Sequence, residues 1–177
     1  MPNTCDRRFR GLAPPSPETS ASYASCPTAE VQAPVEVVWA LLTEPASWGS
    51  FFDVRINRID PSGPATVGQR IEGESGPRLL HLKLAFEFTG IDVEKRRLML
   101  DVKLPFGITI QEDLRCTPID VDKCRVDYRC NFGFPTGWRG VLARLLTLRE
   151  RDAGPINSLS RLKLAAEQRY VDFDGKA

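Results

Sequence analysis

The chain has 177 residues, of which 42% are hydrophobic and 27% are charged, and its formal net charge is +1. This length and composition are typical of one globular domain, and the near-neutral charge argues against a nucleic-acid partner. The sequence has no run of about 18 apolar residues to span a membrane, and no apolar segment follows the N-terminal arginines as in a secretory signal. We therefore expect an unprocessed cytoplasmic protein without stable membrane insertion.

The first 22 residues carry three arginines and a proline-rich stretch, with few apolar side chains to bury. This composition predicts a disordered tail over residues 1–22. We expect one folded domain over residues 23–172 and a short C-terminal tail over residues 173–177.

Secondary structure in the first half of the domain follows from proline positions and apolar spacing. An extended segment over residues 23–32 ends at Ala33-Pro34, because the residue before a proline avoids the helical region and proline suits a first helical turn. Apolar residues at helical spacing then continue to Leu42, and a short helix is expected over residues 46–50. Alternating residues predict two strands, over 52–57 and 67–74.

Four segments between Arg78 and Phe134 alternate apolar and polar residues with a period of two. The pattern predicts long antiparallel strands with one apolar face and one charged face, and it places His81 on the charged face. Glu112 and Tyr128 are the conspicuous polar residues on the apolar face. A turn centred on residue 120 would put Glu112 and Tyr128 directly opposite each other.

The last helix is expected to run from about Thr136 to Tyr170, with one broad apolar stripe. Gly154-Pro155 predicts a kink or a break in it, because a proline cannot donate a backbone hydrogen bond within a helix. Trp138 at its start would either cap a cavity mouth or pack against the domain. Four arginines are expected to make a cationic face of this helix, which is either simply solvated or in transient contact with an acidic partner or membrane surface: Arg139, Arg144, Arg149 and Arg151.

The cysteines are odd in number and include no CxxC pair: Cys5, Cys26, Cys116, Cys124 and Cys130. This pattern argues against a disulfide framework and against a zinc knuckle, so we expect reduced, mostly buried thiols. With His81 as the single histidine, the sequence predicts no metal site, and it contains no cofactor motif.

Strands gathered between helices predict an α+β fold built on an antiparallel sheet. Two stretches, VQAPVEVVWALLTEPASW over residues 31–48 and SLSRLKLAAE over residues 158–167, resemble the START-like helix-grip (SRPBCC) superfamily of polyketide cyclase/dehydratase and lipid-transport type. The resemblance covers roughly Tyr23 to Tyr170. It implies a curved antiparallel sheet of about seven strands wrapped around the long C-terminal helix, with an elongated cavity for an apolar ligand.

The function that this resemblance implies is binding or transport of a small hydrophobic ligand such as a lipid, a quinone or a polyketide-like molecule. From the strand and helix patterns, the residues expected to line the cavity are Phe86, Phe88, Leu100, Val102, Ile110, Glu112, Tyr128, Phe132, Leu142, Leu145, Ile156 and Leu159. The alternative is a cyclase or dehydratase in which Glu112 and Tyr128 move a proton. Glu112 would have neither role if a β-bulge turned it to solvent, or if a bond with Tyr128 only satisfied two buried polar groups.

Overall fold

The computed structural model describes residues 22–75, 82–147 and 150–174. Apart from Ser22, the expected N-terminal tail lies outside the described residues, as do His81 and the last three residues of the chain. Within the described ranges, no helix combines the length and the apolarity needed to cross a membrane.

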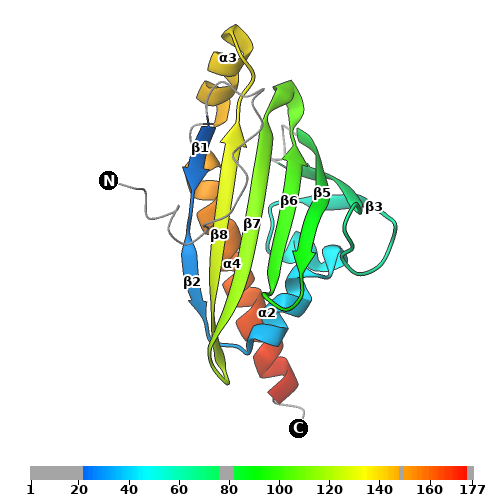
Figure 1. The fold of residues 1–177 in the computed structure, drawn as a ribbon, viewed down its shortest axis with the longest axis vertical. Helices are drawn as coiled ribbons and strands as arrows, with labels where there is room; N and C mark the ends of the chain where they lie inside the picture. The colour runs from blue at the N-terminus through cyan, green and yellow to red at the C-terminus, as the bar shows by residue number, and fades with distance from the viewer. Residues whose placement is uncertain (1–21, 76–81, 148–149, 175–177) are drawn as a thin grey trace.

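Eight strands form one antiparallel sheet in the order β1-β8-β7-β6-β5-β4-β3, with β2 also paired to β8 (Figure 1). Their bounds are β1 (Ser22–Ser25), β2 (Thr28–Val31), β3 (Arg55–Asp60), β4 (Arg70–Ser75), β5 (Leu82–Asp92), β6 (Arg97–Lys103), β7 (Thr109–Asp120) and β8 (Lys123–Gly133). The expected first strand is divided in two at Cys26-Pro27, because Pro27 has no N–H for the ladder. The Pro27 carbonyl still accepts a 3.0 Å hydrogen bond from the Tyr128 N–H, so both halves remain on β8.

The helices are α2 (Val35–Leu42), α3 (Trp138–Thr147) and α4 (Glu150–Asp174), with two short 3-10 turns, η1 (Pro45–Ser50) and η2 (Pro105–Gly107). Helix α4 runs behind β8 and β7 in Figure 1 and covers one face of the sheet, which we call the inner face. The predicted α+β fold, with a long C-terminal helix against an antiparallel sheet, is confirmed. A break at Gly154-Pro155 is not found, because α4 continues through Pro155. The region does form two helices, but α3 ends at Thr147 and α4 begins at Glu150.

The cysteines differ from the expectation at one position. Cys116, Cys124 and Cys130 are free and buried, as the sequence predicts. Cys26, however, is disulfide-bonded, so the prediction that every cysteine is a reduced thiol is wrong there. An odd number of cysteines leaves room for such a pair beside three free thiols, and the partner of Cys26 lies outside the described residues.

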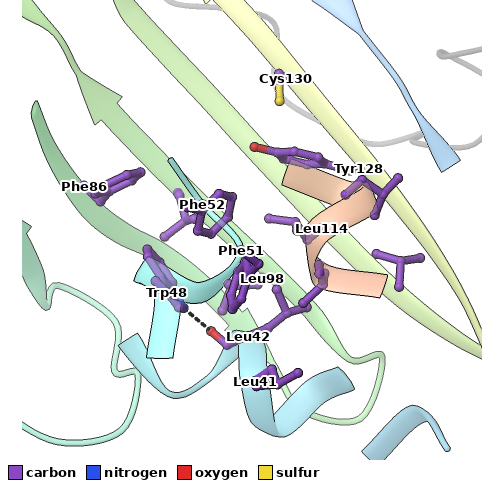
Figure 2. Close-up of a cluster of buried hydrophobic side chains, with 14 of the residues drawn as sticks. Leu41, Leu42, Trp48, Phe51, Phe52, Phe86, Leu98, Leu114, Tyr128 and Cys130 are labelled. Carbon is purple, nitrogen blue, oxygen red and sulfur yellow. Dashed lines mark hydrogen bonds between the residues drawn. The ribbon is translucent and has the colours of Figure 1, made fainter. Parts of the chain in front are cut away.

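The alternation in the four long strands places their apolar side chains on the inner face, where residues such as Phe88, Leu100 and Leu114 are each 1% exposed. At the end of the domain near α2 and η1, this face is filled by a solid aromatic cluster. Trp48 of η1 is fully buried, and its ring lies 5.2 to 5.5 Å from the rings of Phe52, Phe86 and Phe88. Figure 2 shows Trp48 beside Phe52 and Phe86, together with the hydrogen bond from Trp48 Nε1 to the Leu42 carbonyl.

Helix α3 packs closely on the segment that precedes it. Gly140 is buried, and a Cβ atom at this position would lie 1.9 Å from the carbonyl oxygen of Pro135. A clash with a backbone atom cannot be relieved by a side-chain rotation. Only glycine at position 140 therefore allows α3 to approach Pro135 this closely.

Replacing Gly140 with alanine is expected to lower the free energy of unfolding by about 1 to 3 kcal/mol, because the added methyl group overpacks the contact with Pro135. Gly154→Ala is the matched control, since the same change in α4 meets no atom within 4 Å. This control should gain about 0.5 to 1 kcal/mol from the better helix propensity of alanine. Urea denaturation of both variants checks the prediction, and equal effects at the two glycines would contradict it.

Candidate functional site

A cavity of about 710 Å³ lies between the inner face of the sheet and the first turns of α4. Gly154 and Pro155 form part of its wall, and an added Cβ at Gly154 would meet no neighbouring atom. Small residues at the start of α4 thus leave space against the sheet, whereas the larger aromatic rings fill the space beside η1. The inner face carries a solid core at one end and a cavity at the other.

The structure sorts the residues that the sequence assigned to the cavity into three groups. Those that line it are Phe86, Val102, Ile110, Glu112, Tyr128 and Phe132. Phe88, Leu100 and Leu159 are buried in the solid core and do not reach the cavity. Leu142, Leu145 and Ile156 point to solvent, with exposed fractions of 44%, 62% and 53%. The assignment of the residues in the second and third groups to the cavity wall is wrong.

Trp138 also departs from both expectations. Its side chain is 72% exposed and is absent from the cavity wall, so it neither caps the mouth nor packs against the domain. Trp48 is fully buried in the core, and Trp39 is packed against it.

Several cavity residues come from turns, which the strand pattern could not identify. Pro105 and Phe106 belong to the connection between β6 and β7. Phe52 lies between η1 and β3, outside any strand, although the sequence predicts a strand over residues 52–57. Phe106 adopts a positive φ of 65° and is 62% exposed, so it lies where the cavity meets the surface. The Pro-Phe-Gly sequence is a turn signal, and it is the one feature of the sequence that could have pointed to this part of the wall.

The rim of the cavity also carries an ion pair between α4 and the segment after η1. The Arg161 Nη1 atom lies 3.7 Å from Asp53 Oδ1, and both side chains are largely exposed. An exposed pair of this kind contributes little to stability.

Deeper in the cavity, Glu112, Tyr128 and Cys130 form a polar cluster on the apolar inner face. The predicted register is wrong by two residues: Glu112 pairs with Cys130, and Tyr128 pairs with Leu114. The β7–β8 ladder is symmetric about residue 121 rather than residue 120 as far as the Pro118–Cys124 pair, and after an irregularity it closes with the Asp120–Lys123 pair. A shift of two keeps each side chain on its face, so Glu112 and Tyr128 are diagonal neighbours rather than opposite ones.

Glu112 is 8% exposed, and burial raises the pKa of its carboxyl group to about 7. A hydrogen bond from the Tyr128 hydroxyl opposes this effect by stabilising the charged form. Burial raises the pKa values of Tyr128 and Cys130 well above their usual ranges, so both groups are neutral near pH 7. The Oε2 atom of Glu112 has no hydrogen-bond partner among the described residues.

The burial and hydrogen bonding of Glu112 bear on the two alternatives in which this residue has no function. A bulge that turns Glu112 to solvent is excluded, because its side chain is buried and lines the cavity. The bond with Tyr128 leaves one carboxyl oxygen unpaired, and an unpaired buried oxygen costs about 1 to 3 kcal/mol.

Among the described residues, no group of three or more His, Cys, Asp or Glu side chains could hold a metal ion.

Comparison with known families decides the identity of the domain. The model of the family described as "Polyketide cyclase / dehydrase and lipid transport" matches residues 27–166, which is most of the chain. The chain belongs to this family. The resemblance to START-like helix-grip proteins that the sequence suggested is therefore confirmed.

Solved structures with the same fold are distant in sequence from this polyketide cyclase/lipid-transport family member. Norcoclaurine synthase from Thalictrum flavum, solved with dopamine and hydroxybenzaldehyde, is 15% identical with a TM-score of 0.61, and the match covers 88% of this chain and 89% of the synthase. The Zhui aromatase/cyclase from Streptomyces sp. R1128 is 13% identical with a TM-score of 0.66, over 84% of this chain and 96% of the cyclase. A comparison with curated protein sequences finds no match. At these identities the likeness shows the fold alone.

Proposed function

We propose that the protein binds a small hydrophobic molecule that carries a hydroxyl or carbonyl group, with this group held by Glu112. The observation that carries the proposal is the unpaired Oε2 atom of a buried carboxyl group on the wall of an otherwise largely apolar cavity. A ligand hydroxyl would donate to this oxygen, and a protonated Glu112 would donate to a ligand carbonyl. Either bond would remove the cost of the unpaired group.

The size and lining of the cavity support the same class of ligand. Its volume of about 710 Å³ falls within the range of about 300 to 1,000 Å³ that small-molecule pockets occupy. Phe52, Phe86 and Phe132 offer aromatic surface to a ring system or an alkyl chain. We propose that the lining residues Phe86, Val102, Ile110, Glu112, Tyr128 and Phe132 contact the ligand. The family description, which names lipid transport and polyketide chemistry, agrees with an apolar ligand.

A pair of matched probes tests this proposal. 2-Naphthol and 2-methylnaphthalene have nearly the same shape, but only the first carries a hydroxyl group. We expect the wild-type protein to prefer 2-naphthol by about tenfold, as one hydrogen bond to a buried carboxylate is worth about 1.5 kcal/mol or more. Glu112→Leu should abolish the preference while it retains binding of 2-methylnaphthalene. Titration calorimetry or fluorescence gives both affinities.

The control for this experiment is Glu87→Leu, the same change on the outer face of β5, where Glu87 forms an ion pair with Arg70. This variant should keep the preference for 2-naphthol. Binding of neither probe by the wild-type protein would contradict the proposed ligand class. Binding of both probes with equal affinity would contradict only the proposed role of Glu112, and not the proposed ligand class.

A second candidate function is proton transfer, and the observation that favours it is the pKa of Glu112 near 7. A general acid or base works best when its pKa lies near the working pH. In an intramolecular aldol cyclisation, the carboxylate would take a proton from the carbon next to one carbonyl group. A carbon–carbon bond would then form to a second carbonyl, whose oxygen would receive the same proton back from Glu112. The proton balance closes within the site.

Glu112→Gln separates this enzyme from a binding protein, because glutamine keeps the size and hydrogen bonding of the side chain but cannot transfer a proton. On a soluble aryl 1,5-diketone, a cyclase should lose at least about a hundredfold in turnover on this substitution and keep its affinity for the diketone. Wild-type turnover should follow the ionisation of one group near pH 7. Turnover equal in the wild type and in Glu112→Gln would rule out the proton-transfer role.

A further inference from the structure

Helix α3 turns its apolar side to water. Trp138, Val141, Leu142 and Leu145 have exposed fractions between 44% and 72%. Their spacing of three, four and seven residues from Trp138 places them on one side of the helix. We call these four residues the α3 stripe. An apolar stripe of this kind normally faces the core of a globular domain. Its exposure on α3 therefore indicates a surface that binds a partner.

The opposite side of α3 explains why the stripe cannot turn inward. Gly140 and Ala143 are buried, and the absence of a side chain at Gly140 permits its close approach to Pro135. The small residues therefore form the packed side of the helix. A rotation of α3 about its axis would replace them with Trp138 and Leu145, which the space beside Pro135 cannot accept. The outward direction of the stripe is built into the packing of the domain.

The charges on α3 have one sign. Arg139 and Arg144 are its charged residues, and no acidic residue occurs between Trp138 and Thr147. At 100° per residue the two arginines fall on either side of the stripe. The Arg139 guanidinium lies 5.7 Å from the centre of the Trp138 ring, and that of Arg144 lies 5.6 Å from the Phe134 ring. Apolar residues flanked by arginines, with tryptophan beside them, are typical of helices that lie in the surface of an anionic bilayer.

The stripe lies at the end of the domain where the cavity opens. Pro135 lies between α3 and the η2 turn at the cavity rim. A Cβ atom on Gly107 of η2 would lie 3.6 Å from Pro135 Cγ, and Gly140 of α3 packs against the Pro135 carbonyl. Phe106, on the cavity rim, is exposed beside Gly107, and Thr147 at the end of α3 is itself a wall residue. In Figure 1, α3 is at the end of the molecule opposite the C-terminus.

We infer that α3, together with Phe106, is a docking surface for an anionic lipid bilayer, with the α3 stripe among the acyl chains and Arg139 and Arg144 at the phosphate groups. The observations that support it are the outward stripe, the single sign of charge and the position beside the cavity mouth. Docking in this orientation holds the mouth against the bilayer surface. The inference concerns a surface and does not depend on which molecule the cavity binds.

Co-sedimentation with vesicles tests the inference on the full-length protein. Vesicles of phosphatidylcholine with added phosphatidylserine should bind the protein about tenfold more tightly than vesicles of phosphatidylcholine alone, and added salt should remove the difference. Leu145→Glu should weaken binding to the anionic vesicles at least about tenfold, because it places a negative charge in the stripe. Leu164→Glu is the matched control: Leu164 is 65% exposed on α4, and its replacement should leave binding unchanged.

Tryptophan fluorescence provides a second measurement. Trp48 is fully buried and Trp39 is half-buried, so Trp138 should account for quenching by brominated acyl chains. Trp138→Phe should remove this quenching while it keeps most of the vesicle binding. The inference is overturned if Leu145→Glu binds vesicles as well as the wild type does. It is equally overturned if sedimentation equilibrium shows a wild-type dimer that Leu145→Glu dissociates, since the stripe would then join two copies of the chain.

Discussion

Replacing Trp48 with alanine is expected to lower the free energy of unfolding by about 3 to 5 kcal/mol, which is the usual range for a fully buried large aromatic residue. Three aromatic rings surround Trp48 within 5.5 Å and would face an empty space after the change. The Leu42 carbonyl would also lose its 3.1 Å hydrogen bond from Trp48 Nε1. Urea denaturation, followed by circular dichroism, measures the loss directly.

Two further variants separate the causes of this loss. Trp48→Phe keeps an aromatic ring in the cluster but removes the indole N–H, so it should cost less than Trp48→Ala. Trp138→Ala deletes the same side chain at a position that is 72% exposed, and it should change stability by no more than about 0.5 kcal/mol. A loss below about 1 kcal/mol in Trp48→Ala would mean that this end of the inner face is not a solid core.

The alternation in the central strands explains why the fold could be predicted from the sequence. A period of two fixes which residues share a face, whatever the length of the turns. The β7–β8 register differs from the expected one by two residues, and Glu112 still lies on the inner face with Tyr128. The face of a side chain was therefore predictable, whereas its partner across the ladder depended on the irregularity between Pro118 and Asp120.

The direction of α3 could not be predicted in this way. Helical spacing shows that Leu142 and Leu145 share a side, but not whether this side faces the sheet or the solvent. The sequence pattern predicts one helix over residues 136–170, and on that prediction Leu142 and Leu145 were assigned to the same broad apolar stripe as Leu159 and Leu162. Because α3 ends at Thr147, its rotation is set instead by the contact of Gly140 with Pro135.

The wall of the cavity was predictable only where it is built by strands. Val102, Ile110 and Phe132 follow from the alternation, whereas Phe106 comes from a turn with no periodic signal. The cavity itself depends on how much space α4 leaves at Gly154 and Pro155. The sequence marked these two residues as a helix interruption, although their effect in the structure is to supply small side chains opposite the sheet.

The ionisation of Glu112 should make the stability of the protein fall as the pH rises. In the unfolded chain Glu112 ionises near its ordinary pKa of 4.5, whereas in the folded protein burial raises the pKa to about 7. Between these values the folded state holds a proton that the unfolded state has lost, so the contribution of Glu112 is complete below about pH 4.5 and is lost as the pH passes 7. At about 1.4 kcal/mol for each pH unit between the two pKa values, the loss amounts to about 3 kcal/mol.

Glu112→Gln cannot ionise, so the difference in unfolding free energy between this variant and the wild type isolates the effect of Glu112 from all other titrating groups. Tyr128 and Cys130, which face the carboxyl group, stay neutral over this range and do not offset its charge. We expect the variant to gain about 3 kcal/mol relative to the wild type between pH 4.5 and pH 8. Glu94→Gln, the same change at an exposed position, should follow the wild-type curve. Urea denaturation at several pH values gives the comparison. A constant difference across the range would mean that the Glu112 carboxyl is no harder to ionise in the cavity than in water.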